Sequence, residues 1–68
     1  MLSTFPFGWV KNIDSENWQL LWDSINKSFY AKGAVTKKVI KLSDTSDWFE
    51  SKKFADQVLS NPSKYFPS

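Results

Sequence analysis

The chain has 68 residues with no cysteine and no histidine, and nine lysines against seven acids give it a formal charge of +2. This length allows a single domain over residues 1–68 with one small core, and we expect its ends, residues 1–4 and 67–68, to be frayed. The missing residue types exclude disulfide bonds, thiolate metal sites and catalysis by histidine. Aromatic residues make up 18% of the chain, so ring packing has to supply much of the core.

Residues 5–13 alternate between apolar and other side chains, which predicts a strand. The apolar members share one parity and would cover one face: Phe5, Phe7, Trp9 and Ile13. Pro6 and Gly8 occupy the other parity. Because proline donates no hydrogen bond to a sheet and glycine weakens a strand, we expect an edge strand or an irregular extended arm around residues 7–11.

Residues 15–31 have the apolar spacing of a long amphipathic helix, because their large side chains recur three or four positions apart. The predicted buried stripe contains Trp18, Leu21, Trp22, Ile25 and Phe29. Asp14 or Ser15 would cap the first turn, with Ile13 packed on the first residue of the stripe as a hydrophobic staple. Gly33 would end the helix.

Residues 34–42 are dense in β-branched side chains, which favours a second strand. Two adjacent β-branched residues make the alternation imperfect, so a short helix is the alternative interpretation. In a strand, Ile40 and Leu42 would face the core. Lys37 and Lys41 would face solvent.

Residues 48–60 are predicted to form a second helix. Asp47 followed by Glu50 has the form of a capping box, with Ser46 as the alternative cap, and a proline follows the last turn. The apolar side chains of this segment are Trp48, Phe54, Ala55, Val58 and Leu59. Two adjacent bulky rings cannot easily both point inward at a helix start, so we predict that Phe49 lies on the surface.

Together these elements predict a small α+β domain in the order β-α-β-α, with a two-stranded sheet packed on the long amphipathic helix. A two-stranded sheet is marginal on its own. A second copy of the chain or a partner could therefore complete it, and a homodimer with two-fold symmetry would be the commonest result.

The sequence offers no convergent set of residues for an enzyme. Its carboxylates fall at predicted helix starts, in a break rich in capping residues and on polar helix faces, where capping and solvation explain them. With two glycines in the chain, no glycine-rich phosphate loop is present. We therefore predict a non-enzymatic protein with no cofactor, no metal site and no small-molecule substrate.

The surplus of aromatic residues favours protein binding, because tryptophan and tyrosine are enriched at interaction hot spots. The candidates for a protein-binding surface are Phe5, Phe7, Trp9, Phe49, Tyr65 and Phe66. The segment FPFGW could add to the edge of a partner's sheet while its rings fill pockets. The alternative is that these N-terminal rings cover the long helix of their own domain.

The second function class is nucleic-acid binding. Residues 32–68 hold seven of the nine lysines, and the candidates for phosphate contacts are Lys32, Lys37, Lys38 and Lys41. The predicted order of elements would suit a small basic DNA-binding protein of winged-helix or excisionase type. Arginine, which makes the commonest base-specific contact, is absent, and a solvated lysine face is the plain alternative.

No stretch approaches the ~18–20 apolar residues of a membrane span. The N-terminus also lacks the basic start and apolar run of a secretory signal, so we expect a cytoplasmic protein with no membrane partner. Lysine in place of arginine and the small size suggest a low-GC bacterium, a phage or another mobile element. Small proteins of that kind often act as inhibitors or adaptors of a host machine.

Overall fold

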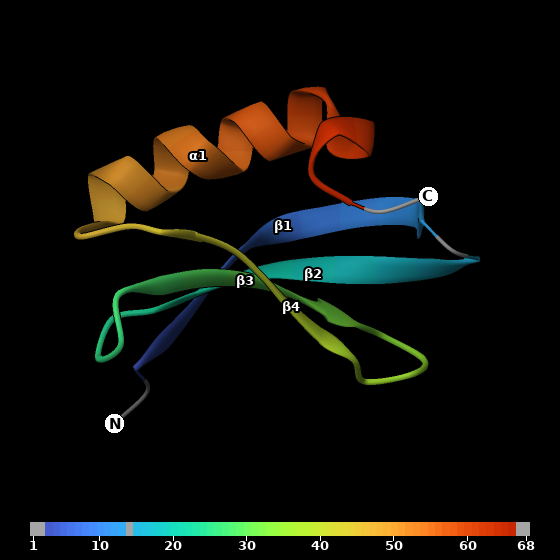
Figure 1. Ribbon diagram of the computed structural model, residues 1–68, viewed down its shortest axis with the longest axis horizontal. Coiled ribbons are helices and arrows are strands. Elements are labelled where there is room, and N and C mark those ends of the chain that lie inside the picture. Colours follow the sequence, from blue (N-terminus) through green and yellow to red (C-terminus); the bar gives the residue numbers. More distant parts are fainter. Residues whose placement is uncertain (1–2, 14, 67–68) are drawn as a thin grey trace.

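The computed structural model describes residues 3–13 and 15–66, and the side chains of all of these except residues 12 and 13. It contains a four-stranded antiparallel sheet followed by one α-helix (Figure 1). The elements are β1 (Thr4–Ile13), β2 (Glu16–Asp23), β3 (Ser28–Gly33), β4 (Val39–Asp44), α1 (Trp48–Ser60) and the 3-10 turn η1 (Pro62–Lys64). Strands that are consecutive in the sequence are neighbours in the sheet, so the topology is a meander. The predicted order β-α-β-α and the two-stranded sheet are therefore wrong.

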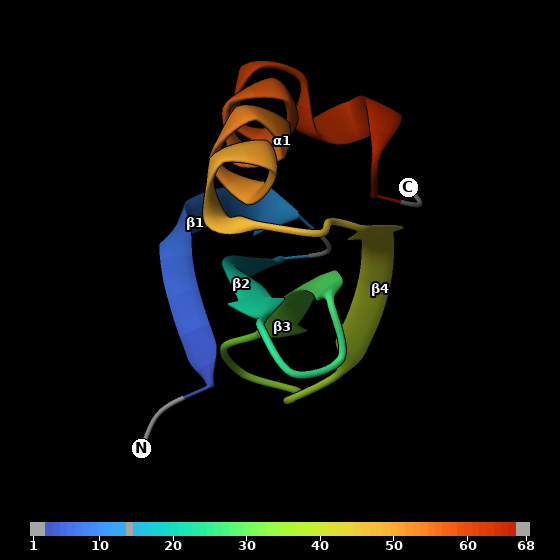
Figure 2. The same ribbon diagram turned by 90° about the vertical axis from the view of Figure 1, so that its left-hand side faces the viewer.

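The sheet is strongly curved, so that β1 and β4 stand on opposite sides and α1 lies over the opening between them (Figure 2). The core fills the space between the concave face of the sheet and the helix. Its buried side chains are Val10, Trp18, Leu20, Trp22, Phe29, Ala31, Ala55, Val58 and Phe66. The opposite, convex face of the sheet has no layer over it among the elements described here.

The predicted helix over residues 15–31 is a β-hairpin formed by β2 and β3. A spacing of four residues fits a helix and also fits a strand, because four is close to one helical turn and is a multiple of the strand period. Trp18 and Trp22 are consequently buried on the concave face together with Leu20, which completes the strand alternation. Leu21 belongs to the opposite parity, and Ile25 lies in the connecting turn with 75% of its surface exposed.

A turn at residues 24–27 breaks the helical pattern. The Asp23 carboxylate accepts hydrogen bonds from the N–H of Ile25 (2.9 Å) and from the N–H and side-chain amide of Asn26 (3.2 and 2.8 Å). Lys27 then adopts a left-handed conformation with φ of 54°. Aspartate and asparagine stabilise turns in this way because their side chains bond to the backbone a few residues on. Asp14 and the side chain of Ile13, which the predicted cap and staple required, lie outside the described residues.

The edge strand predicted around residues 7–11 is confirmed, because β1 is the first strand of the sheet. A β-bulge interrupts it: Pro6 pairs with Leu21 and Gly8 pairs with Leu20, which leaves Phe7 as an extra residue. Gly8 has φ of 128°, a conformation that glycine adopts without strain. The predicted single apolar face is wrong, because the alternation shifts at the bulge.

Beyond the bulge, Val10 takes the buried position and Trp9 turns to the convex face. The residue before β1 is held as well, since the Ser3 carbonyl accepts hydrogen bonds from the N–H and the hydroxyl of Ser24 (2.8 and 3.0 Å). Ser3 and Thr4, which were expected to fray, are therefore held to the sheet. Residues 1–2 and 67–68 lie outside the described part of the chain.

The second predicted strand is shifted along the chain. Residues 34–38 form the β3–β4 connection, and β4 runs from Val39 to Asp44. Its predicted orientation is confirmed, because Ile40 and Leu42 pack on the core while Lys41 is exposed. Leu42 is the extra residue of a second bulge, between the pairs Phe29–Ser43 and Tyr30–Lys41.

The helix predicted over residues 48–60 is confirmed as α1. Asp47 caps it by accepting a hydrogen bond from the Glu50 N–H (2.8 Å), and the Glu50 carboxylate accepts one from the Ser46 N–H (3.2 Å). Ala55 and Val58 are the apolar residues of α1 that are buried in the core. No helix in residues 3–13 and 15–66 is long and apolar enough to cross a membrane.

We expect Leu20→Ala to lower the free energy of unfolding by about 3–4 kcal/mol, because Leu20 is fully buried between the sheet and α1. Val39→Ala on the convex face is the control and should change it by less than about 0.5 kcal/mol. Urea denaturation followed by circular dichroism measures both. Equal effects of the two substitutions would contradict the assignment of the core to the concave face.

Candidate functional site

Phe7, Trp48 and Phe49 are linked by ring contacts where β1 meets the start of α1, and Phe5 lies two residues earlier on β1. We call this group, Phe5, Phe7, Trp48 and Phe49, the aromatic patch. Phe49 is 72% exposed, Trp48 43% and Phe5 38%. The ring centroids of Trp48 and Phe49 lie 5.3 Å apart in an edge-to-face arrangement, and those of Trp48 and Phe7 lie 5.7 Å apart. Exposed rings in mutual contact are unusual on a small domain and are typical of interaction surfaces.

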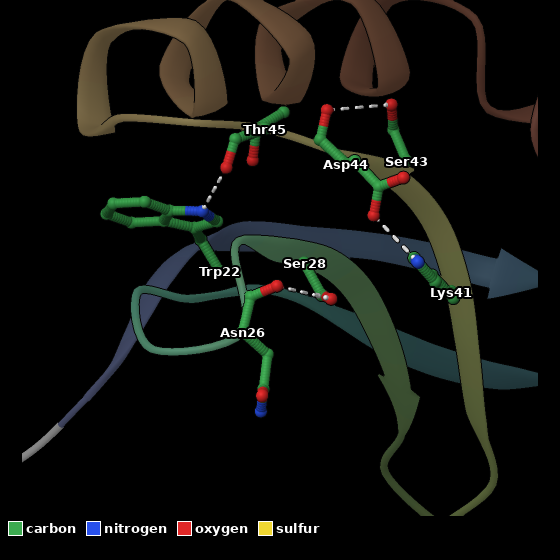
Figure 3. Close-up of polar contacts among 7 residues, drawn as sticks. All are labelled: Trp22, Asn26, Ser28, Lys41, Ser43, Asp44 and Thr45. Carbon is green, nitrogen blue, oxygen red and sulfur yellow. Dashed lines mark hydrogen bonds and ion pairs between the residues drawn. The ribbon is translucent and has the colours of Figure 1, made fainter.

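The patch is fixed from below by rings and a hydrogen bond that belong to the core. Phe5 contacts Trp22 and Phe7 contacts Phe29, with centroid distances of 5.7 and 5.9 Å. The indole Nε1–H of Trp22 donates to the Thr45 carbonyl (3.0 Å), which attaches the segment before α1 to the sheet (Figure 3). The hydroxyls of Thr45 and Ser51 are also hydrogen-bonded (2.7 Å) in the buried space under the helix start.

The structure joins two of the predicted protein-binding residues, Phe7 and Phe49, through Trp48. Phe5 lies two residues before Phe7 on β1, and the other three predicted residues lie elsewhere. Phe5, Phe7 and Phe49 belong to the patch. Trp9, 48% exposed, lies on the convex face of the sheet. Tyr65 is partly buried against Phe54, with centroids 5.3 Å apart.

Phe66, the sixth predicted residue, is only 4% exposed, and its ring packs on Trp18 at 5.8 Å. It therefore belongs to the core and is not available as a docking residue on this surface. The residues after η1 fold back on the domain in this way and close the end of the core that α1 does not reach (Figure 1).

Trp48 is the member of the patch that the sequence prediction missed, because it was placed on the buried side of α1. The available signal was its position next to the capping residue Asp47. At the first position of a helix the chain has only begun its turn, and here the ring lies over Phe7 at the sheet edge. The neighbouring prediction of an exposed Phe49 is confirmed.

The four lysines proposed for phosphate contact are all exposed, but they do not form one line. Lys32 lies on β3, while Lys37 and Lys38 lie in the β3–β4 connection. Lys41 is paired with Asp44, with Nζ 2.7 Å from the carboxylate (Figure 3). Because both partners are well exposed, this ion pair contributes little to stability.

The helix–strand–helix arrangement behind the winged-helix and excisionase interpretation is not formed. The segment expected as its first helix is the β2–β3 hairpin, and α1 packs on the sheet through Ser51, Ala55 and Val58. The outward side of α1 carries acids as well as lysines, including an ion pair between Lys52 and Asp56 (3.6 Å). This helix therefore presents no uniformly basic face to a DNA groove.

A carboxylate holds the lysine-bearing connection in place. Glu16 accepts hydrogen bonds from the Val35 N–H (2.8 Å), the Thr36 N–H (3.0 Å) and the Thr36 hydroxyl (2.7 Å). Gly33 makes room for it, since a Cβ at that position would lie 2.7 Å from a Glu16 oxygen. Sequence reasoning assigned Glu16 to a helix start and Gly33 to a helix end, and both assignments are wrong because the helix is absent.

These hydrogen bonds also favour the ionised form of the Glu16 carboxyl. The N–H and hydroxyl of Thr36 lower the pKa of the Glu16 carboxyl below its ordinary value of 4.5, burial opposes this shift, and Val35 and Lys38 add to it. Hydrogen bonds from the Asn26 side chain and backbone lower the pKa of Asp23 in the same way. Among residues 3–13 and 15–66, no group of three or more acidic, histidine or cysteine side chains gathers to hold a metal ion.

The lowered pKa of Glu16 predicts a pH-dependent contribution to stability. A folded-state pKa below the unfolded value stabilises the protein above about pH 4.5, and this contribution disappears as the pH falls through the folded pKa. We therefore expect thermal unfolding to show that Glu16→Gln costs most near neutral pH and progressively less as the pH falls below about 4.5. Thr36→Val removes one donor and should show part of the same pH dependence. Parallel stability curves for wild type and Glu16→Gln would contradict this role.

Comparison of the chain with protein-family models, curated protein sequences and solved structures found no match in any of the three. The functional conclusions below therefore depend on the surfaces of the molecule alone.

Proposed function

We propose that this domain is a non-enzymatic binding module, an adaptor or inhibitor, that docks on another protein through the aromatic patch. The observation that supports this proposal is the pair of adjacent exposed rings, Trp48 and Phe49, at the start of α1. The domain already has a dense aromatic core without the outer surfaces of these rings. The exposed surfaces of Trp48 and Phe49 are therefore not used in the packing of the domain itself.

Burying the patch would supply a large part of a binding free energy. Removing one large apolar side chain from water is worth about 1.5–3 kcal/mol. Tryptophan in particular recurs among the few residues that dominate measured interfaces. Two such rings at one point are enough for the centre of a small interface, with the surrounding polar residues excluding water.

The patch is also preorganised, which reduces the entropy lost on binding. Trp48 rests on Phe7, and Phe7 is a bulge residue held between Trp48 and the buried ring of Phe29. The cap at Asp47 fixes the direction in which the first helical turn begins. A partner would therefore meet rings that are already in position.

Docking through side chains is favoured over the addition of β1 to a partner's sheet. Pro6 lacks an N–H group, and the bulge at Phe7 interrupts the strand next to the patch. The partner we propose is a different protein, because a four-stranded sheet needs no second copy to complete it. Sedimentation equilibrium of the purified chain should accordingly give the monomer mass.

We expect Phe49→Ala and Trp48→Ala to weaken partner binding by about tenfold or more, because truncation of a central aromatic residue is typically the costliest change at an interface. The partner is first identified by placing a photo-crosslinking phenylalanine analogue at position 49 in the native host and sequencing the adduct by mass spectrometry. The affinities of the variants for that protein are then measured by calorimetry.

Val35→Ala is the matched control, because Val35 is an apolar residue with 74% exposure in the β3–β4 connection, away from the patch. It should leave the affinity unchanged. Circular dichroism and the melting temperature should show that Phe49→Ala remains folded. Full binding by Phe49→Ala and Trp48→Ala, both folded, would exclude the patch as the docking site.

A further inference from the structure

The convex face of the sheet is a second surface, distinct from the aromatic patch. The strand register places Trp9, Gln19, Lys32 and Val39 in one row across all four strands. The next row contains Pro6, Leu21, Tyr30 and Lys41. Neither α1 nor η1 lies over these rows, since both are on the concave side (Figure 2). The face therefore combines an exposed tryptophan, smaller apolar groups and lysines on a rigid sheet.

The exposure of Trp9 is a product of the bulge in β1. An uninterrupted strand would have placed Trp9 with Phe5 on the concave face, but the extra residue Phe7 gives the buried position to Val10. The indole is thus presented to solvent by a hydrogen-bonded strand rather than by a loop. A ring held in this way can stack on a planar group at a small entropic cost.

The charge in the row of Trp9 is positive. Lys32 lies two strands away in the same row, about 10 Å across the sheet from strand spacing. Lys38 lies opposite Gly33, on the other face of the sheet, where its charge acts on Glu16. The acid at this end among the described residues, Glu16, is directed into its hydrogen bonds with Val35 and Thr36.

We propose that this face binds single-stranded nucleic acid, with a base stacked on Trp9 and a phosphate beside Lys32. Stacking on an exposed ring next to a cationic track is the usual way in which proteins hold single strands without sequence preference. The absence of arginine fits this mode, because recognition of specific bases in a duplex depends mostly on arginine. A duplex is disfavoured, since its bases are already stacked and cannot cover the Trp9 ring.

The test is titration of the full chain with fluorescein-labelled dT12, followed by anisotropy at several salt concentrations. We expect binding that weakens with salt, and Trp9→Thr, a substitution suited to a strand, should weaken it about tenfold or more. Lys32→Gln should reduce the slope of log K against log salt by about 0.7, as expected for one lost phosphate contact on a single strand.

Lys53→Gln is the charge-matched control, because Lys53 is exposed on α1, on the other side of the sheet. This variant should keep the wild-type slope, and Phe49→Ala should keep the wild-type affinity for dT12. Equal losses in Lys32→Gln and Lys53→Gln would reduce the binding to net charge and overturn the proposal. No binding of dT12, tighter binding of a 12-base-pair duplex, or equal binding of a glutamate oligomer that ignores Trp9→Thr would also overturn it.

Discussion

A single helix has to close the concave face of a four-stranded sheet, and the other features of the domain follow from this constraint. The 13 residues of α1 span only about 20 Å. At the far end, the segment after η1 completes the cover, with Phe66 packed on Trp18. At the near end none of the described elements lies beyond the helix start, so the rings at the start of α1 and on β1 are covered on one side only. The aromatic patch therefore lies where the segments that cover the concave face end.

The first strand and the α-helix could be predicted from the sequence, but the segment of residues 14–33 between them could not. The edge strand and α1 could be recognised because proline, glycine and a capping aspartate act locally. Residues 14–33 could not be assigned by spacing alone, since Trp18 and Trp22 fit both periods. The deciding signal was Asp23 with Asn26, which form a turn. Whether these two residues form a turn depends on whether the segments before and after them can pair as strands. That pairing is a non-local property of the chain.

The candidate surfaces also combine features that follow from local sequence with features that do not. The exposure of Phe49 followed from crowding next to Trp48, a local argument. The position of Trp9 did not follow, because one extra residue in a strand exchanges its two faces. Likewise Glu16 is twenty residues from Thr36 in the sequence, so no local pattern links the carboxylate to the connection that it holds. The alternation in residues 5–13 therefore predicted that this segment is a strand, but it did not predict which face each side chain occupies.

The β-bulges at Phe7 and Leu42 have a consequence for how the domain behaves at high concentration. Edge strands with a regular row of free backbone groups are templates for aggregation and amyloid growth. In this domain Phe7 interrupts one edge and Leu42 interrupts the other. The kinks leave no long flat edge on which a second sheet can add in register. A small protein can in this way keep several large rings in water without polymerising through its backbone.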